Sequence, residues 1–516
     1  MASSFFMEEF DNEEIDTHGN LRQIEDVTGY IHILKEQLGQ SGGQGAVYRT
    51  DEPDLAIKLV NISPFDQGMG ASKGQVVSHG QVQSHGKIIS QIKGMHQMDY
   101  AELNRRFAAL RLLPIPKNVQ LTLPLCELKN AYGYVMFLLD GMQDFSDAFS
   151  WTDENSYLSN PWLNSLREDE SSANLATFLS GYIKTGGLRR RIAAYTQACC
   201  VLSHLHSLGL VYCDFSGRNC FISTEKNRDI VWLIDADNLS FSESIYPQAV
   251  FTQEFAAPEI MNEGAVFSAY SDCYSFAISL FKDLFCVHPF KGKLMDQGDV
   301  DFIDDNDTTA YSGLLPWIFD SEDDSNECSD GLASAKDILI SSSLMQLFER
   351  TFCQRGKSKP LTRPTMLEWY YALTEYKDNL IKCHHCSMHY DARLGSCPWC
   401  DSHSAYVSIK AHKDGVQTGH ICHELNDKYE FTLPTRLLKG SKPSVSDETL
   451  CTLKFMQEYF EISNIDRINY YFSGRHNPMG ALKGLFGTQQ MPYGSIIEID
   501  TTEGMENYKL EVTIHG

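Results

Sequence analysis

Short apolar runs separated by polar turns dominate the first third of the chain. Four such runs are predicted to be strands, because each is brief and is bounded by turn-forming residues. They lie at residues 31–38, 54–60, 119–125 and 132–139. Residues 101–110 follow another pattern, in which Leu103, Phe107 and Leu110 fall on one face at helical spacing. This mixture predicts an α+β fold.

Later in the chain, helical and strand patterns are segregated. A strong helix is predicted at residues 188–208, whose apolar positions recur every three to four residues. Residues 508–514 alternate apolar and polar positions and are expected to pair with residues 497–499 across a turn. We therefore expect a small β-rich domain of unknown role at 404–516, with one helix near 450–460.

Three polar side chains follow the strong helix. Asp214 precedes Asn219 by five residues, and an apolar strand at 231–234 ends in Asp235. This is the layout of a phosphotransfer centre. One carboxylate orients a hydroxyl, while an amide and a second carboxylate hold magnesium on ATP. Asp and Asn oxygens suit such a hard cation. The Asp–Asn spacing alone is common, so its weight depends on the motifs around it.

A glycine-rich turn between two strands is the first of these motifs. Gly42, Gly45 and Val47 fit the pattern G-x-G-x-x-G-x-V, while Gly39 stands one residue early and implies a longer loop tip. Such a loop brings backbone amides over phosphates without side chains in the way. The alternative is a plain hairpin turn. Lys58 favours the phosphate loop, because a lysine within an apolar strand is costly to bury unless it meets an anion.

The lysine also requires a counter-charge. Glu102 is the one glutamate between Lys58 and Glu127, and it begins the helical pattern at 101–110, so we expect it to pair with Lys58. The intervening residues 66–94 are rich in Gly, Ser, Gln and His and are predicted to be a flexible insertion. The alternative for Glu102 is an exposed carboxylate at a helix start, which the helix dipole favours.

Length and charge restrict the classes of function. A chain of 516 residues is too long for one core, and a formal charge of -25 argues against a nucleic-acid or anionic-membrane surface. The sequence shows no signal peptide and no apolar run of membrane-helix length. We therefore expect a soluble cytoplasmic protein whose 15 cysteines are reduced thiols or metal ligands, with an acidic, loosely ordered lead-in at 1–25.

Four cysteines in the last third of the chain have the spacing of a metal site. Cys383 and Cys386 form one C-x-x-C pair, and Cys397 and Cys400 form a second one ten residues later. Two such pairs place four thiolates around zinc at tetrahedral corners, which leaves no position for a reactive water. We therefore expect a structural zinc ribbon at 380–403. The histidines between the first two cysteines would be poorer ligands.

The chain resembles bacterial eukaryotic-like serine/threonine protein kinases, in the branch that carries a zinc ribbon behind the kinase domain. The residues 110–116 and 233–237 and the apolar helix that begins near Asp272 carry the specific part of the resemblance. Glu259, in Ala-Pro-Glu, and Arg363 stand where these kinases pair a glutamate with an arginine. The resemblance implies that Asp272 holds backbone amides of the catalytic loop.

The resemblance also implies the architecture and the reaction. We expect a two-lobed protein kinase fold at 26–376, with the N-lobe at 26–139 and the C-lobe at 143–376, followed by the zinc ribbon and the β-rich domain. The implied activity is transfer of the γ-phosphoryl group of ATP to Ser or Thr hydroxyls of protein substrates, with autophosphorylation. Implied cofactors are ATP, Mg²⁺ and structural Zn²⁺, and a cognate protein phosphatase is an implied partner.

Individual residues take their roles from the same resemblance. Asp214 would be the catalytic base or orienting carboxylate, and Asn219 and Asp235 would hold Mg²⁺. Lys58 would bind the α- and β-phosphates, and Glu102 would position it. The remaining nucleotide contacts would come from Gly39, Gly42, Gly45 and Val47 in the glycine loop and from Leu139 and Met142 at the hinge, whose backbone would meet the adenine.

Several positions depart from the family pattern. Cys213 replaces the arginine that tethers a phosphorylated activation loop, so we expect that loop phosphorylation is not the main switch. Ser216 replaces the lysine two residues after the catalytic aspartate, and Arg218 would then supply the charge on the transferred phosphoryl group. Ala236 and Asp237 replace the Phe and Gly of D-F-G; Asp237 either adds a carboxylate near the metal or is solvated.

These departures leave two alternatives open. One is a pseudokinase that acts as a nucleotide-binding scaffold in a signalling or stress-response system. The other is transfer of a nucleotidyl group, rather than a phosphoryl group, from the same pocket onto protein.

Overall fold

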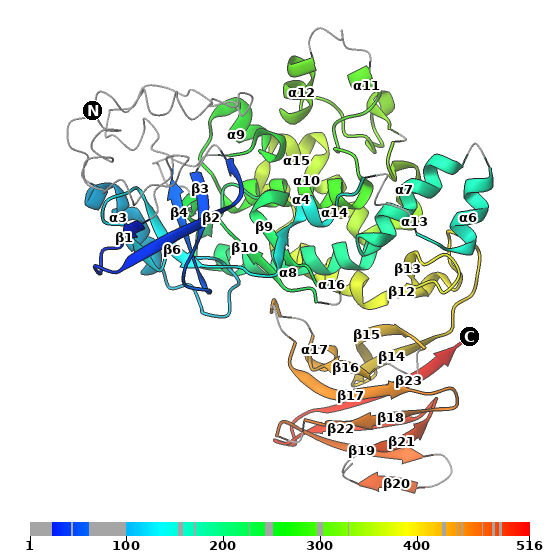
Figure 1. The fold of residues 1–516 in the computed structure, drawn as a ribbon. Coiled ribbons are helices and arrows are strands. Elements are labelled where there is room, and N and C mark those ends of the chain that lie inside the picture. The colour runs from blue at the N-terminus through cyan, green and yellow to red at the C-terminus, as the bar shows by residue number, and fades with distance from the viewer. Residues whose placement is uncertain are drawn as a thin grey trace.

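The structure is a computed structural model of residues 1–516 (Figure 1). The described residues are 23–42, 45–60, 100–152, 158–169, 172–226, 228–242, 251–296, 303–328, 330–425, 430–440, 442–444, 447–466, 468–476, 480–483 and 488–516. The predicted insertion at 66–94 lies outside them. Of the predicted lead-in, only the last three residues are described, and they form strand β1 (Gln23–Glu25).

An antiparallel sheet of six strands and helix α3 (Tyr100–Arg111) form the first lobe (Figure 1). The strand order is β1-β2-β3-β4-β6-β5. The further bounds are β2 (Ile31–Gly42), β3 (Gly45–Thr50), β4 (Leu55–Val60), β5 (Cys126–Glu127) and β6 (Gly133–Phe137). The Asn104 amide ties α3 to the turn before β6, because Nδ2 donates to the carbonyl oxygens of Leu128 at 2.7 Å and Ala131 at 2.8 Å.

Three of the four strands predicted in this lobe are confirmed, as β2, β4 and β6. The prediction of a strand at 119–125 was wrong. That segment makes a single bridge, from Leu121 to Leu233, and strand β5 begins at Cys126. Pro124 has no N–H to donate to a ladder, which favours an end to pairing at this point.

Helices build the second lobe around one large core. Their bounds are α4 (Phe145–Ala148), α6 (Pro161–Glu168), α7 (Ala173–Lys184), α8 (Gly187–Ser207), α9 (Pro258–Glu263), α10 (Ala269–Phe285), α11 (Lys293–Asp296), α12 (Ile303–Tyr311), α13 (Lys336–Leu339), α14 (Ser342–Phe352), α15 (Gln354–Ser358) and α16 (Met366–Asn379). Helix α8 confirms the helix predicted at 188–208. It is joined to α10 and α16 by the aromatic series Tyr195, Phe276 and Trp369, whose rings lie 5.6 and 5.7 Å apart.

Short strands at the junction of the two lobes carry the polar residues of interest. They are β7 (Met142–Asp144), β8 (Leu210–Val211), β9 (Cys220–Ser223), β10 (Val231–Leu233) and β11 (Ser240–Phe241). Strands β10, β9 and β7 form one small antiparallel sheet, and β11 pairs with β8. The segments that connect these strands present Asp214, Asn219 and Asp235.

A small ribbon follows α16 without a break. Strand β12 (Leu380–Lys382) pairs with β13 (His389–Asp391), and the cysteines lie in the turns around them. Cys383, Cys386 and Cys397 are buried within the same core as the helical lobe. The ribbon is therefore packed as part of the helical lobe.

The last part of the chain is a sandwich of two antiparallel sheets with its own core. One sheet has the order β15-β14-β23-β22-β19-β20 and the other β16-β17-β18-β21. The bounds are β14 (Tyr406–Lys413), β15 (Val416–Glu424), β16 (Glu430–Pro434), β17 (Thr449–Phe455), β18 (Tyr459–Ser463), β19 (Tyr470–His476), β20 (Gly480–Lys483), β21 (Gln489–Pro492), β22 (Ile496–Thr501) and β23 (Asn507–His515). The predicted pairing across the last turn is confirmed, with Ile499 opposite Tyr508. The helix predicted near 450–460 was wrong, because that segment forms β17, a turn and the start of β18.

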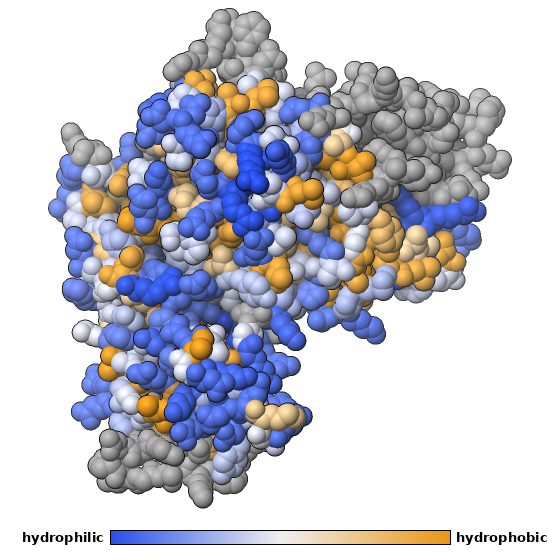
Figure 2. All heavy atoms as spheres, turned by 180° about the vertical axis from the view of Figure 1, so that it is seen from behind, coloured by the Kyte–Doolittle hydropathy of each residue, from blue (hydrophilic) through white to orange (hydrophobic). Residues whose placement is uncertain are grey.

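The sandwich contacts the helical lobe through helix α17 (Arg436–Lys439) and strand β15. Arg436 bonds Asp378 of α16 through Nη2 at 2.8 Å and Asp447 through Nε at 2.9 Å. Figure 1 shows the sandwich beside the helical lobe, away from the first sheet. Hydrophilic residues cover most of the face of the sandwich seen in Figure 2. Among the described helices, none is both long and apolar enough to cross a membrane.

Candidate active site and cysteine cluster

Lys58 is buried between two neighbouring strands. On β4 it lies opposite Val47 of β3 and opposite Tyr134 of β6. Its Nζ lies 2.9 Å from Oδ1 of Asp235, and 3.0 and 3.2 Å from the two carboxylate oxygens of Asp237. The anion that the sequence required for this lysine is thus supplied by two carboxylates from the segment after β10.

The charges of this group depend on one another. Burial alone would lower the pKa of Lys58, but the carboxylates of Asp237 and Asp235 raise it well above its ordinary value. Burial pushes the pKa of Asp237 up, yet the ammonium group of Lys58 holds it below its ordinary value. Burial raises the pKa of Asp235 despite the lysine. Lys58 and Asp237 therefore form the firmly ionised pair of the group.

Asp235 stands in an unusual backbone conformation. Its φ is 58° and its ψ is 48°, in the left-handed region that non-glycine residues seldom adopt. The residue before it is tied to the segment that carries Asp214 and Asn219, since the Ile234 amide donates to the Asn219 carbonyl at 3.0 Å and the Tyr212 hydroxyl donates to the Ile234 carbonyl. These bonds hold the strained position and keep Asp235 beside Asn219.

Asp214 is buried within a set of hydrogen bonds. Its Oδ1 accepts from the Thr252 amide at 2.9 Å and from the Thr252 hydroxyl at 3.0 Å. Its Oδ2 accepts from Nδ2 of Asn219 at 3.0 Å, and the same amide group donates to the Asp214 carbonyl at 2.8 Å. Burial raises the pKa of Asp214, although the bonds from Thr252 oppose that shift. The carboxylate is therefore positioned to accept a hydrogen bond from an aliphatic hydroxyl, as it does from Thr252.

The backbone that presents Asp214 is anchored by Asp272 of α10. The two carboxylate oxygens of Asp272 accept the amides of Tyr212 at 2.7 Å and Cys213 at 2.9 Å, which confirms the predicted role. His206 Nε2 lies 2.9 Å from the same carboxylate. Cys213 has a φ of 74°, so these bonds hold a strained residue directly before Asp214.

The predicted nucleotide contacts lie around the first sheet and the lobe junction. Gly45 opens β3 so close to β4 that an added Cβ would lie 2.1 Å from the Leu59 carbonyl oxygen, and hence glycine is required there. Gly42 pairs with Gly45 across the hairpin, while nothing is described of the contacts of Gly39. Leu139 and Met142, both partly buried, flank the connection between the lobes.

Two predicted residues are not brought into a described contact with the group around Lys58. Glu102 lies in the first turn of α3, but its side chain is outside the described part of the structure. Arg218 is exposed on the turn Gly217–Asn219. Burial raises the pKa of Asp144, and the charge of Arg218 only partly opposes that shift. The roles of Glu102 and Arg218 stay predictions.

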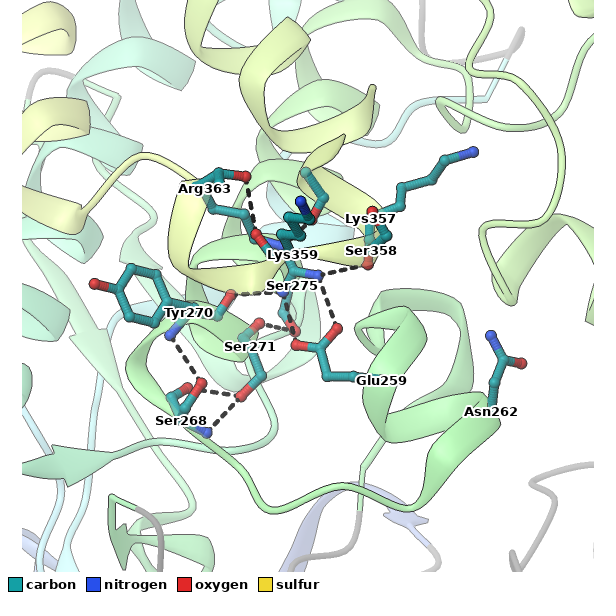
Figure 3. Close-up of polar contacts among 12 residues, drawn as sticks. Glu259, Asn262, Ser268, Tyr270, Ser271, Ser275, Lys357, Ser358, Lys359 and Arg363 are labelled. Carbon is teal, nitrogen blue, oxygen red and sulfur yellow. Dashed lines mark hydrogen bonds and ion pairs between the residues drawn. The ribbon is translucent and has the colours of Figure 1, made fainter. Parts of the chain in front are cut away.

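The predicted pair of Glu259 and Arg363 is present (Figure 3). Nη1 and Nη2 of Arg363 each lie 2.7 Å from a different oxygen of Glu259, and the guanidinium also donates to the Tyr270 carbonyl at 3.0 Å. The Arg363 side chain is 0% exposed. Because a bidentate pair fixes orientation as well as distance, it anchors the segment that carries Thr252 to the core of the helical lobe.

Sequence reasoning missed two residues of this site. It left Asp237 either near the metal or solvated; the structure instead shows a buried side chain on Lys58. It did not single out Thr252, which makes two bonds to Asp214. The sequence could have pointed to Thr252 by its position, because it lies six residues before Pro258 in the segment that resembles an activation loop.

The four predicted cysteines form one cluster. Their sulfur atoms all lie within 4.8 Å of one another, with Cys383 3.7 Å from Cys400 and Cys386 3.5 Å from Cys397. Four thiolates at tetrahedral corners, about 2.3 Å from a zinc ion, would lie about 3.8 Å apart, so the donor set fits zinc. The neighbouring His384 and His385 are exposed.

Comparison with known proteins agrees with this geometry. Residues 170–370 match the protein kinase domain family, and the match spans Asp214, Asn219, Asp235 and Arg363. No curated protein matches the chain.

Two solved structures are similar over much of the chain. One is described as the ROP18 kinase domain in complex with AMP-PNP and sucrose, with 14% identity, a TM-score of 0.39, and coverage of 72% of this chain and 91% of that one. The other is the autoinhibited serine kinase domain of the giant muscle protein titin, with 15% identity, a TM-score of 0.40, and coverage of 67% and 81%. At this level of similarity neither structure serves as support for the fold or the function of this chain.

The family match and the architecture confirm the predicted fold class. The chain has an α+β, two-lobed protein kinase fold, followed by a cluster of four cysteines whose arrangement fits a zinc ribbon and by a β-rich domain.

Proposed function

We propose that this chain is an ATP- and Mg²⁺-dependent protein kinase that transfers the γ-phosphoryl group to Ser or Thr hydroxyls of protein substrates, its own included. The observation that supports this most is the convergence of Lys58, Asp235, Asn219 and Asp214 at the lobe junction. Lys58 lies 2.9 Å from Asp235, Ile234 links to Asn219 at 3.0 Å, and Asn219 lies 3.0 Å from Asp214. The cation contacts one carboxylate, the amide contacts the other, and a backbone bond links the two segments; these are the groups that phosphoryl transfer requires.

Each group has a distinct task in the proposed reaction. Lys58 binds the α- and β-phosphates, while Asn219 and Asp235 provide oxygen ligands to Mg²⁺, which neutralises phosphate charge when bound. Asp214 orients the acceptor hydroxyl and takes its proton as the oxygen–phosphorus bond forms and the bond to ADP breaks. The hydrogen bond from the Thr252 hydroxyl to Asp214 supports this task, because it shows the carboxylate accepting the same functional group.

The cysteine cluster is proposed to hold one structural Zn²⁺. Four thiolates fill its tetrahedron and leave no position for substrate. Because three of the cysteines lie in the core of the helical lobe, zinc would stabilise that lobe as well as the ribbon.

The surroundings of the protein are also proposed. None of the 15 cysteines forms a disulfide, which supports a reducing compartment such as the cytoplasm. Protein substrates follow from the kinase fold, whereas the cognate phosphatase has only the resemblance in its favour.

A pseudokinase scaffold is the second candidate, and one observation favours it. Lys58, Asp214 and Asp235 all have partners within the chain, so the site is satisfied without nucleotide. Three results would establish this role. The chain would bind nucleotide but transfer no phosphoryl group, Asp235→Ala would still recognise its partners, and wild type and Asp214→Asn would show the same absence of transfer.

The decisive experiment combines purified protein, Mg²⁺ and γ-labelled ATP with casein as a general acceptor. Label on casein or on the chain itself is expected for wild type, with phosphoserine or phosphothreonine after hydrolysis. Asp214→Asn is expected to lose about 10³-fold or more in rate, as loss of a general base commonly does. The exposed Asp324→Asn is the matched control. Phosphotyrosine alone would refute the proposed specificity, and equal rates for wild type and Asp214→Asn would refute the mechanism.

A further inference from the structure

The two carboxylates on Lys58 differ in how far they are withdrawn from solvent. The Asp237 side chain is 3% exposed, like that of Lys58, whereas Asp235 is 18% exposed. Asp237 contacts the lysine with both oxygens, and Asp235 contacts it with one. The Asp237 carboxylate is therefore buried against Lys58, while the Asp235 carboxylate is partly exposed to solvent.

The place of Asp237 is built by three elements. The Tyr134 hydroxyl on β6 lies 3.3 Å from Oδ1 of Asp237, and Lys58 is the direct neighbour of Tyr134 on β4. The Tyr134 ring packs on Phe107 of α3, with centroids 4.8 Å apart. Asp237 therefore lies beneath α3, against the sheet, in a place prepared by a hydroxyl donor and an ammonium group.

We propose that Asp237, at the position of the D-F-G glycine, is the resident counter-ion of Lys58 and positions it for the nucleotide phosphates, which leaves Asp235 for the metal. This assignment rests on the proposed kinase function. Asp237 thereby does for Lys58 what Glu102 of α3 was expected to do.

The division of tasks follows from charge balance. A buried ammonium group needs an anion at all times, because an unpaired buried charge is costly. If Asp235 were its main partner, magnesium would have to compete with Lys58 for that carboxylate. With Asp237 in place, Asp235 can turn to a metal while Lys58 stays paired and aimed by the Tyr134 and Asp237 contacts.

A double-mutant cycle on unfolding tests the pair without any reference to activity. Lys58→Met leaves the buried Asp237 without its cation, and Asp237→Asn leaves Lys58 with Asp235 as its remaining carboxylate, so each single variant is expected to unfold more easily than wild type. Each single variant lowers the folding equilibrium constant by some factor. If the two residues act as a pair, the factor lost by the double variant is expected to be at least about tenfold smaller than the product of the two single factors. The exposed pair Lys293 and Glu327 provides the control cycle, with little coupling expected.

Parallel cycles of Lys58→Met with Asp235→Asn and with Glu102→Gln decide between the candidate counter-ions. The proposal requires the strongest coupling with Asp237. Stronger coupling with Glu102 or Asp235, or coupling with Asp237 no larger than in the control pair, would overturn it. The result holds even for a protein that transfers no phosphoryl group, so failure of the proposed function is recognised separately.

The magnesium dependence of ATP binding tests the role rather than the fold. Calorimetric titration of ATP at a series of Mg²⁺ concentrations is expected to show that Asp237→Asn needs about tenfold more Mg²⁺ for half-maximal binding, because Lys58 then holds Asp235. Tyr134→Phe, which removes one hydrogen bond and keeps the ring, is expected to shift this midpoint far less. An unchanged midpoint in a folded Asp237→Asn would refute the division of tasks.

Discussion

The segment that carries Asp214, the proposed catalytic loop, depends on one buried carboxylate, and Asp272→Asn tests that dependence. Asp272 is 1% exposed and accepts the amides of Tyr212 and Cys213, one on each oxygen. An asparagine keeps one acceptor oxygen but turns an NH₂ group toward the second amide. The variant therefore loses one charge-assisted hydrogen bond and leaves one buried N–H group unpaired.

The magnitude follows from these two losses. A hydrogen bond to a charged group contributes roughly 1.5–3 kcal/mol, and a buried donor left without a partner costs roughly 1–3 kcal/mol, so we expect about 3 kcal/mol of lost stability. Cys213, with a φ of 74°, is released from its anchor and its backbone can relax. Because Asp214 is the next residue, a displacement of about 1 Å there is expected to lower kcat about 100-fold.

Two measurements on the same preparations check this prediction. Urea unfolding gives the loss in the free energy of unfolding, and phosphoryl transfer at saturating ATP gives kcat. Ser275→Ala is the matched control, since Ser275 is also buried on α10 but bonds only to the Ser271 carbonyl of its own helix. A loss below about 1 kcal/mol together with an unchanged kcat would refute the reasoning, because single unmade buried bonds cost more than that.

Three further predictions concern the rest of the chain. Cys386→Ser is expected to lower bound zinc below one per chain and to lower the Tm, whereas Cys451→Ser in the sandwich core keeps its zinc; equal zinc contents would contradict the site. Glu259→Gln, which leaves the buried Arg363 without its counter-charge, is expected to cost about 3 kcal/mol in urea unfolding, and a cost under about 1 kcal/mol would contradict an anchoring pair. Burial raises the pKa of Asp283 from 3.8 to about 6, so the folded protein holds this proton more tightly and loses stability as pH rises through this window. Relative to Asp283→Asn, wild type is expected to lose about 2 kcal/mol between pH 4 and pH 7, and parallel stability curves would argue against that shift.

Local patterns predicted the elements whose signal lies within a few residues. Periodicity predicted helix α8, a short apolar run bounded by turn residues predicted strand β4, and spacing predicted the cysteine cluster. Periodicity failed for residues 450–460, because a short apolar run fits a helix and a buried strand equally well. The outcome is decided by pairing with β16 and β18, the strands before and after β17 in the chain, and the apolar pattern of the run does not register that pairing.

The residues that contact the site residues could not be predicted from the sequence as readily. Lys58 was predicted to need an anion, but Asp237 is 179 residues away and belongs to a position that is glycine in the family pattern. Thr252 bonds Asp214 across 38 residues. Neither contact leaves a local pattern, because both arise from how the two lobes and the loop between them fold together.

The central claim is that the residues around Asp214 transfer a phosphoryl group from ATP to protein. Intact-mass spectrometry of the chain after incubation with Mg²⁺ and ATP tests it most directly, since it reports both whether transfer occurs and which group is transferred. Added masses of one or more phosphoryl groups are expected in wild type, and none are expected in Asp214→Asn. An added adenylyl group, or identical spectra for the two proteins, would contradict the claim.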